Sequence, residues 1–488
     1  MSARSTVNRA LRRRPVMDRV LSSSSASSSA GGGAGGGHAQ TTRFVVVRPL
    51  VLGIETSCDD TCAAVVDARG VVLGEARRSQ HHIHEEYGGV VPNLAMEAHV
   101  QAIDAVVAQA LGEARRALGE EVSTIVANDS AAGDVGTSSK GEHECNQSAA
   151  GVIDAVAATI GPGLVLCLRV GVSKARRVAA ENGLPFIPVH HMEAHALVAR
   201  ADEASRASAS FPFVALLVSG GHNMLVLARG LGRYTVLGTT LDDAAGEAFD
   251  KTARLLELDV SSGGGPAVEQ LAMRGDPRAL AFPIPLRRSR TKAKTCDFSF
   301  AGLKTAVRMY MERVRAERSE GGDDGDAQLR IKADVAASFQ HAAVAHLRER
   351  TARAVEWAKE MEPTVNCLMV SGGVASNASV RAALQEVADA AGLPLVCPAP
   401  SLCTDNGVMV AWTGQERLAA GLAEPAPPIE EIARFQEDPK SVRFQLRPRW
   451  PIGTADDRSA HGLRSQKTAG IADPLTTGME RLATADSF

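Results

Sequence analysis

Two histidines with the spacing of a helical metal site lie in the segment His190–His195. On a helix, His191 and His195 are four residues apart and share one face, a geometry that chelates a divalent metal. Glu193 would lie about 200° around the helix from His191, so neither zinc-protease pattern of two histidines and a glutamate is met. An acidic third ligand must come from elsewhere, and Asp405, at the start of a helical segment, is a candidate. Helix capping is the alternative role for Asp405.

Glycine turns form a second group of candidates. Ser219-Gly220-Gly221 lies between two apolar runs, and Ser371-Gly372-Gly373 joins an apolar run to a helical one. Glycines let backbone N–H groups approach an anion, and a helix N-terminus adds a favourable dipole. With the polar turn at 57–60 and Gly263-Gly264-Gly265, these turns resemble the nucleotide-clamping elements of the actin/Hsp70/sugar-kinase superfamily. The sequence contains no Walker A motif, which disfavours a P-loop fold.

Charged residues supply two further candidates. Asp250 is placed early in a helical stretch, where it could accept hydrogen bonds from a ribose; an exposed charge pair with Lys251 is the alternative. A basic run is the best candidate for contact with a nucleic-acid backbone, although a solvated surface is the alternative. Its cations are Arg287, Arg288, Arg290, Lys292 and Lys294, with Lys304 nearby and Arg443, Arg447 and Arg449 toward the end.

The elements that must position these residues alternate between strands and helices. Residues 44–73 predict a series of hairpins, and residues 211–228 repeat the same order of strand, polar turn and strand. Helical spacing follows at 93–118 and again after the turn at 161–163. This order predicts an α/β fold with two related halves, each with a polar turn at a strand end. Residues 120–150 look like a polar insertion.

Composition narrows the class of protein. A chain of 488 residues predicts two or three packed units, and no apolar run reaches the roughly 18 residues that a membrane-spanning helix needs. Eight cysteines, none in a CxxC pair, favour a reducing compartment. Aromatic residues make up only 4%, which disfavours recognition of RNA by stacking on an aromatic sheet.

The charge is unevenly distributed. Residues 1–48 hold eight arginines and one acid, a balance of +7, whereas the remaining 45 basic and 55 acidic residues leave the body near −10. This excludes a globally basic nucleic-acid binder, so any contact with RNA must use a local patch. The arginine- and serine-rich start is typical of an organellar transit peptide, and we expect a mitochondrial rather than a chloroplast destination.

Several ordered motifs resemble those of a known family. They are LGIETSCDDTCAAVVD, YGGVVPNLA, GPGLVLCLRVG, VHHMEAHA, LLVSGGHNMLVL, DDAAGEAFDKTARLL, FSFAGLKTAV, MVSGGVASN and CTDNG, between about residues 50 and 436. Together they resemble the tRNA adenosine threonylcarbamoyltransferases of the TsaD/Kae type, once described as O-sialoglycoprotein endopeptidases. The N-terminal extension makes the chain most similar to the organellar branch.

This resemblance implies a two-lobed actin-like fold with a cleft between the lobes. The expected division is a disordered transit peptide and linker at 1–43, lobes at 44–210 and 211–436, and an extension at 437–488, largely disordered after about 454. One divalent ion, iron or zinc, would be held by His191, His195 and Asp405. The implied substrate contacts are Leu217, Val218, Ser219, Gly220, Gly221, Asp250, Gly265 and Asn377.

The implied reaction transfers a threonylcarbamoyl group from threonylcarbamoyl-adenylate to N6 of the adenosine beside the anticodon, position 37, with release of AMP. The tRNAs would be those that read codons beginning with A, and the adenylate would come from a separate synthase. Asp59 and Asp60, in the first polar turn, are the carboxylates expected to assist proton transfer. Whether the protein forms a homodimer is left open, and no membrane partner is expected.

Three other functions are alternatives to the transferase, and each requires a feature that discriminates it. An ATP-dependent kinase or hydrolase of a small metabolite would share the fold, but magnesium prefers carboxylate ligands to imidazoles. A non-catalytic scaffold requires the cleft residues to be dispensable. A metalloprotease lacks a glutamate on the metal-facing side of the His191/His195 helix.

Overall fold

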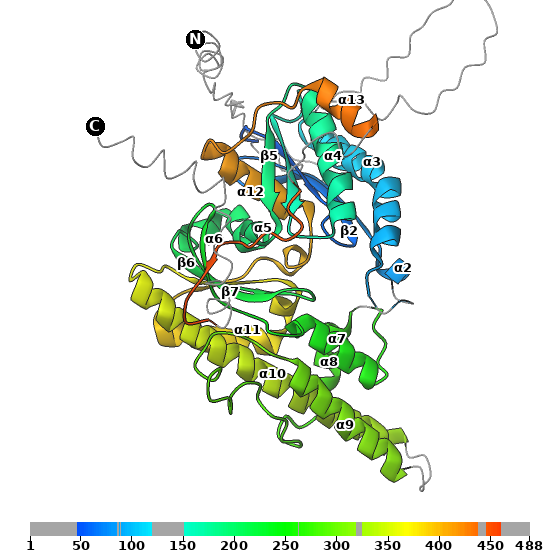
Figure 1. Ribbon diagram of the computed structural model, residues 1–488, viewed down its shortest axis with the longest axis vertical. Coiled ribbons are helices and arrows are strands. Elements are labelled where there is room, and N and C mark those ends of the chain that lie inside the picture. Colours follow the sequence, from blue (N-terminus) through cyan, green and yellow to red (C-terminus); the bar gives the residue numbers. More distant parts are fainter. Residues whose placement is uncertain are drawn as a thin grey trace, which may run out of the picture.

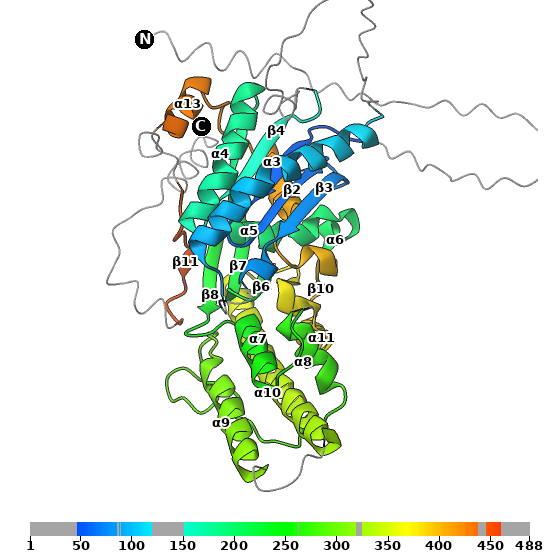
Figure 2. The same cartoon turned by 90° about the vertical axis from the view of Figure 1, so that its right-hand side faces the viewer.

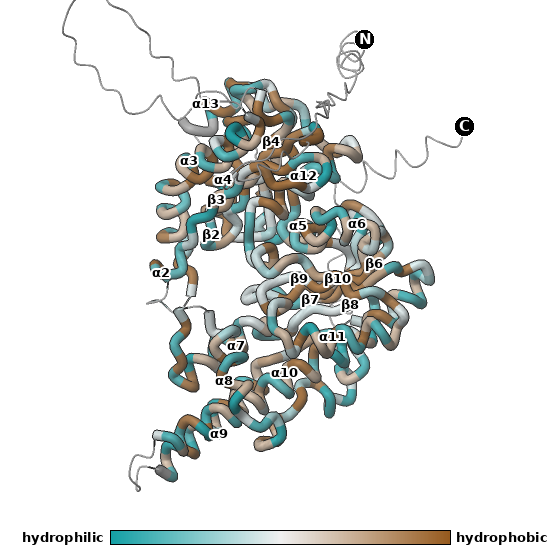
Figure 3. The backbone as a smooth tube through the Cα atoms, turned by 180° about the vertical axis from the view of Figure 1, so that it is seen from behind, coloured by the Kyte–Doolittle hydropathy of each residue, from teal (hydrophilic) through white to brown (hydrophobic). Residues whose placement is uncertain are grey.

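The computed structural model describes residues 46–84, 87, 89–119, 151–261, 263–318, 325–437 and 446–459. The predicted transit segment 1–43 and the predicted insertion 120–150 lie outside these ranges. The described chain forms two lobes that lie one above the other along the longest axis, each built around a sheet (Figure 1). The strands of both sheets carry much of the hydrophobic sequence (Figure 3).

The first lobe contains a five-stranded sheet in the order β3-β2-β1-β4-β5. The first three strands form antiparallel hairpins, and β4 and β5 are added in parallel. Helices α3 (Pro92–Ala117) and α4 (Val165–Glu181) cover one face, where they share a hydrophobic core with the sheet. The strands are β1 (Val51–Glu55), β2 (Asp60–Val66), β3 (Val72–Ser79), β4 (Ala155–Gly161) and β5 (Phe186–His190).

The second lobe repeats this plan. Its sheet has the order β10-β9-β6-β7-β8-β11, with antiparallel β6, β7 and β8 and parallel β9 and β10. The strands are β6 (Phe213–Val218), β7 (Asn223–Gly230), β8 (Arg233–Thr239), β9 (Leu368–Ser371), β10 (Leu395–Val396) and β11 (Thr454–Ala455). The helices include α7 (Ala245–Leu255), α8 (Gly264–Ala272), α9 (Ala301–Arg318), α10 (Gly325–Met361) and α11 (Ala378–Ala391).

Without β11, both sheets have the same arrangement, in which a three-stranded antiparallel meander is extended by two parallel strands from its first strand. This duplication is the one expected of an actin-like fold, so the predicted fold class is confirmed. Among the described helices, none is both long enough and apolar enough to cross a membrane.

Two helices near the end of the chain return to the first lobe. Helix α12 (Gly407–Ala419) packs on the face of the first sheet opposite α3 and α4, and α13 (Ile429–Glu437) contacts α4. A Cβ atom at Gly407 would lie only 2.4 Å from the carbonyl carbon of Ala63, so this close approach requires glycine. The sequence assigned both helices to the second lobe, because the order of elements does not show on which sheet a helix packs.

The C-terminal segment 446–459 connects the two lobes (Figure 2). In the first lobe, the Arg447 N–H donates to the Ile160 carbonyl at 2.8 Å, and His190 Nε2 lies 3.1 Å from the Trp450 carbonyl. In the second lobe, β11 pairs in parallel with β8. Order therefore continues through 454–459, slightly past the position of about 454 where disorder is expected to begin, while 460–488 lie outside the described residues.

One buried histidine in the second lobe makes stability depend on pH. His346 Nε2 accepts a hydrogen bond from the Ser299 N–H at 3.2 Å, and its ring packs against Phe298 and Phe300. Burial, assisted by the charge of Arg350, lowers the pKa of His346 to about 3. The unfolded chain therefore binds one proton more than the folded chain between about pH 6.5 and 3, and stability falls as the pH falls through this window.

We predict that His346→Gln reduces the loss of stability in acid, because the glutamine amide oxygen can accept the same hydrogen bond without titrating. Between pH 6.5 and 5 the histidine should cost about 2 kcal/mol of the free energy of unfolding. Denaturant unfolding at pH 7 and pH 5 measures this difference, with the exposed His82→Gln as the matched control. An equal acid loss in the wild type and in His346→Gln would contradict the prediction.

Candidate metal centre and substrate site

The predicted metal ligands converge where the two lobes meet. One ligand atom from each of His191, His195 and Asp405 lies within 4.8 Å of the others. The Asp405 Oδ1 atom is 3.0 Å from His195 Nε2 and 3.7 Å from His191 Nε2. Both histidines are only 4% exposed, whereas the Asp405 side chain is 23% exposed, so the imidazoles are desolvated and the carboxylate lies on the solvent-accessible side of the site. The structure therefore brings together the two-imidazole, one-carboxylate set that the sequence predicted.

Local structure explains how each ligand is aimed. Helix α5 (His191–Leu197) begins directly after β5, and the His190 side chain caps it by accepting from the Met192 N–H at 3.1 Å. The i, i+4 spacing then places the His191 and His195 rings edge to face at 4.7 Å. Asp405 does not cap α12, since Asn406 accepts from the Met409 N–H at 2.8 Å in that role. The capping alternative for Asp405 is therefore wrong.

A buried carboxylate that the sequence analysis missed supports this site. Glu55, at the end of β1, is fully buried and lies 3.3 Å from His191 Nδ1 through its Oε2 atom. It also accepts from the Ser57 N–H and the Thr159 hydroxyl, both at 2.5 Å. An acceptor at Nδ1 favours the tautomer in which His191 Nε2 holds a lone pair, on the side that faces Asp405. A glutamate inside the apolar run VLGIE was the available signal.

Burial and charge pairing together set the pKa values of the groups in this cluster. Burial opposes the charged form of His191, but the carboxylates of Asp405 and Glu55 raise its pKa to about 9. Burial also opposes ionisation of both carboxylates, yet the His191 charge holds the pKa of each below its usual value. The cluster thus favours two anionic carboxylates around a shared positive charge.

The Ser219–Gly221 turn lies beside this cluster. It is the turn between β6 and β7, closed by a 2.7 Å hydrogen bond from the Ser219 N–H to the His222 carbonyl. The His222 ring centroid is 5.8 Å from that of His191, and burial lowers the pKa of His222 to about 4. Gly220 and Gly221 are exposed, whereas Leu217 and Val218 are buried in β6. The turn can therefore present backbone N–H groups next to the metal ligands.

The second glycine turn packs against the first. Val218 lies on β6 and Ser371 ends the neighbouring β9, so both strands deliver their carboxyl ends to one edge of the sheet. A Cβ atom at Gly372 would lie 2.2 Å from the Val218 carbonyl oxygen, and its φ of +107° also favours glycine. The N–H of Gly246, near the start of α7, donates to the Ser219 carbonyl at 3.2 Å.

The remaining predicted substrate residues occupy two other positions in the second lobe. Asp250 on α7 accepts from the Gly264 N–H at 3.1 Å, and burial raises its pKa; Gly265 follows directly on α8. Asn377 caps α11 through the Val380 N–H and donates to Gln340, so its side chain already has partners within the fold. Neither group makes direct contact with the His191/His195/Asp405 cluster in the structure.

The first polar turn is tied to the loop that carries Asp405. Arg77 donates to Asp60 Oδ2 at 2.7 Å and to the hydroxyl of Thr404 at 2.9 Å. Burial raises the pKa of Asp60, and its Oδ1 atom has no partner within the described part of the chain. A carboxylate with a raised pKa and an unpartnered oxygen accepts a proton more readily than an ordinary aspartate does.

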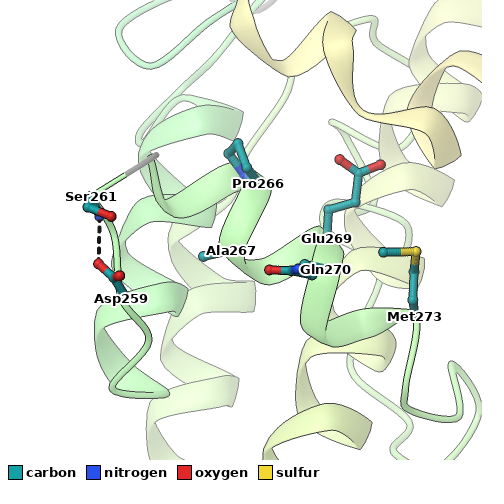
Figure 4. A pocket seen from close by; sticks show the side chains of 7 residues that line it. All are labelled: Asp259, Ser261, Pro266, Ala267, Glu269, Gln270 and Met273. Carbon is teal, nitrogen blue, oxygen red and sulfur yellow. Dashed lines mark hydrogen bonds between the residues drawn. The ribbon is translucent and has the colours of Figure 1, made fainter.

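A hollow of about 410 Å³ lies on the outer side of α8 (Figure 4). The residues lining it are Asp259, Ser261, Pro266, Ala267, Glu269, Gln270 and Met273, none of which was predicted as a site residue. Glu269 Oε1 accepts from the Ala378 N–H at 2.7 Å and so links α8 to the start of α11. The hollow borders the Gly263–Gly265 turn without including it.

Comparison with known proteins decides the family. The family model "TsaD: tRNA N6-adenosine threonylcarbamoyltransferase" matches residues 71–127 and 144–412. The chain belongs to the TsaD family. An Arabidopsis thaliana protein named probable mitochondrial tRNA N6-adenosine threonylcarbamoyltransferase is 48% identical over 429 residues, which cover 88% of this chain and 80% of that protein.

Other TsaD relatives are nearly as similar over most of their length. A Rhodospirillum rubrum tRNA N6-adenosine threonylcarbamoyltransferase is 42% identical over 82% of this chain and 94% of its own. A Mus musculus mitochondrial enzyme of the same name is 40% identical over 83% of this chain and 86% of its own. The TsaD chain described here is therefore a tRNA-modifying transferase, as its motifs predicted.

We predict that Glu55→Gln weakens divalent-cation binding by about 10- to 100-fold, because His191 loses the carboxylate that orients its ring. Titration of the purified protein with Zn²⁺ measures the change, and Glu75→Gln, an exposed glutamate on the same sheet, is the matched control. A Glu55→Gln protein that folds and binds Zn²⁺ as tightly as the wild type would show that Glu55 does not position His191.

Proposed function

We propose that this TsaD protein transfers the threonylcarbamoyl group of threonylcarbamoyl-adenylate to N6 of adenosine 37 in tRNAs that read codons beginning with A, releasing AMP. One observation carries the proposal: the Ser219–Gly221 turn lies beside the His191/His195/Asp405 cluster. The ring of His222, the residue after the turn, is 5.8 Å from the ring of His191. A phosphate held at this turn would place the adjoining carbonyl group toward the cluster. The adenylate is supplied by a separate synthase, which is a partner in the sequence of reactions.

The donor set fits a divalent ion. Two imidazole nitrogens and one carboxylate oxygen are ligands that suit either zinc or ferrous iron, and His191 already has the outer carboxylate typical of such sites. Bound at His191, His195 and Asp405, the ion would supply Lewis-acid polarisation and a template for substrate oxygens. One iron or zinc ion per subunit is the expected cofactor.

The residues of the chain would divide the remaining work. The substrate is a mixed anhydride with a good leaving group, so N6 can attack the carbamoyl carbon without a protein nucleophile. Backbone N–H groups of Gly220 and Gly221, in the turn that begins at Ser219, would hold the phosphate of the departing AMP, and Asp250 would accept from its ribose. Asp60, whose pKa is raised by burial and whose Oδ1 atom has no partner within the described part of the chain, would take the proton that leaves N6.

The remaining predicted contacts are assigned smaller parts. Leu217 and Val218 form the strand end that fixes the turn, and Gly265 lies beside Asp250 at the start of α8. Asn377 already caps α11, so its side chain is engaged within the fold. It would act on the substrate mainly by holding the second glycine turn, Ser371–Gly373, in position. Asp59 remains the alternative proton acceptor.

The same reaction would take place in mitochondria. The Arg- and Ser-rich residues 1–43 have the composition of a transit peptide, and the Arabidopsis and mouse relatives are named as mitochondrial proteins. A chloroplast destination is the alternative for this presequence.

A reconstituted transfer reaction tests the proposal. The protein, a threonylcarbamoyl-adenylate synthase, ATP, bicarbonate, labelled threonine and unmodified tRNA should yield labelled tRNA. The His191→Ala/His195→Ala variant should lose the activity by several orders of magnitude, whereas His341→Ala, at an exposed histidine, should keep it. Full activity in the double variant would refute the proposed metal site. Absence of label with folded, metal-loaded wild type would refute transfer by this protein alone.

A further inference from the structure

The basic loop, residues 287–294, presents charges that the fold does not use. Arg288, Arg290, Lys292 and Lys294 are exposed, and none of the four forms an ion pair with a described residue. Arg287, at the start of the loop, is paired with Glu349 on α10. Some other exposed arginines of this lobe do have acidic partners, as in Arg313–Glu317 and Arg348–Glu386. The loop therefore concentrates uncompensated positive charge in a protein whose body is acidic overall.

A buried arginine holds the backbone of this loop in place. Arg350 on α10 is 1% exposed, and its Nη1 atom lies 3.0, 2.8 and 2.7 Å from the carbonyl oxygens of Lys292, Ala293 and Thr295. Arg353, one turn further along, donates to the Thr295 carbonyl at 3.0 Å. A set of solvated charges would not need such support. These hydrogen bonds give the loop backbone a defined path at Lys292 and Ala293, from which the exposed cations extend on one segment, and this favours a ligand that carries several anions.

Hydrogen bonds connect the end of this loop to the substrate side of the sheet. The Leu241 N–H donates to the Phe298 carbonyl at 2.9 Å, and the Thr240 N–H donates to the Asn223 carbonyl at 2.9 Å. Asn223 follows His222, the residue beside the metal cluster. Each hydrogen-bonded step spans about 4.8 Å, so Phe298, which follows the basic loop after a few residues, lies roughly 10 Å from the Ser-Gly-Gly-His turn.

We propose that the basic loop binds the phosphate backbone of the tRNA substrate while the modified adenosine occupies the cluster, and that Arg350 is the positioning residue of this surface. The inference rests on the tRNA-modifying function of the protein. An RNA backbone is favoured over an acidic protein segment because its phosphates recur at a fixed spacing and require no complementary shape. Contact through phosphates also suits an enzyme that must accept several tRNAs of different sequence.

Charge neutralisation tests the surface. In Arg288→Gln/Arg290→Gln, tRNA binding should weaken about tenfold at low salt, and the slope of log affinity against log salt should become shallower by about two. The matched control, Arg313→Gln/Arg348→Gln, removes two exposed but paired arginines and should change neither quantity. KM for tRNA should rise in the transfer reaction, with kcat at saturating tRNA unchanged.

Two results would overturn the proposal. Unchanged tRNA affinity and salt slope in the loop variant would move the contact to another surface, and an equal loss in the control variant would show only a general effect of charge. Normal tRNA binding combined with loss of binding to a poly-glutamate peptide would assign the loop to an acidic protein. A wild type that transfers no label would instead count against the function and not against the loop.

A second variant tests the role of Arg350 separately. Arg350→Met keeps every exposed cation but removes the donor to three loop carbonyls. Amide hydrogen exchange in residues 288–295 should accelerate, and KM for tRNA should rise several-fold while kcat stays constant. Faster exchange with an unchanged KM would show that Arg350 is only structural, and the charge-neutralised loop variant tests the surface even where this variant folds poorly.

Discussion

The contact between Asp405 and His195, 3.0 Å across a separation of 210 residues, is the constraint on which the rest of the site depends. The two histidines belong to α5, which continues directly from the edge strand β5 of the first sheet. Asp405 can reach them only because the chain, after strand β10 of the second sheet, sends α12 back across the first one. That packing requires an unusually close approach of helix to sheet, which Gly407 allows where it meets Ala63. The candidate metal site thus forms only when both lobes are folded against each other.

Burial makes this contact chemically useful. In water, an imidazole and two carboxylates would interact weakly, but with His191 4% exposed and Glu55 fully buried, the charges of His191, Glu55 and Asp405 shift one another's pKa values. Glu55 belongs to this balance even though it faces away from Asp405, since it holds the opposite nitrogen of His191. The neighbouring Ser219–Gly221 turn remains exposed. The buried imidazoles of His191 and His195 therefore lie next to an exposed glycine turn. This arrangement suits a substrate that carries both a phosphate and an activated carbonyl group.

Short sequence patterns predicted the features that depend only on residues close together in the chain. The spacing of His191 and His195 required only that the segment be helical, and the repeated order of strand, turn and strand was enough to predict two related lobes. Asp405 was identified with the help of family resemblance, because no spacing along the chain shows that α12 crosses between sheets. Glu55 was missed because its importance comes from three partners that only the folded sheet brings together. The order of residues 454–459 could not be predicted for a similar reason: it depends on β8 and on the turn after β4, not on the composition of the segment.

X-ray absorption spectroscopy of the metal-loaded protein shows directly whether His191, His195 and Asp405 hold the ion. We expect a first shell of nitrogen and oxygen only, with the outer-shell scattering of two imidazoles, and with coordination positions filled by exchangeable water. In His195→Ala, one imidazole contribution should disappear. Sulfur in the first shell, or an imidazole count that does not change in that variant, would place the ion elsewhere and contradict a site built from His191, His195 and Asp405.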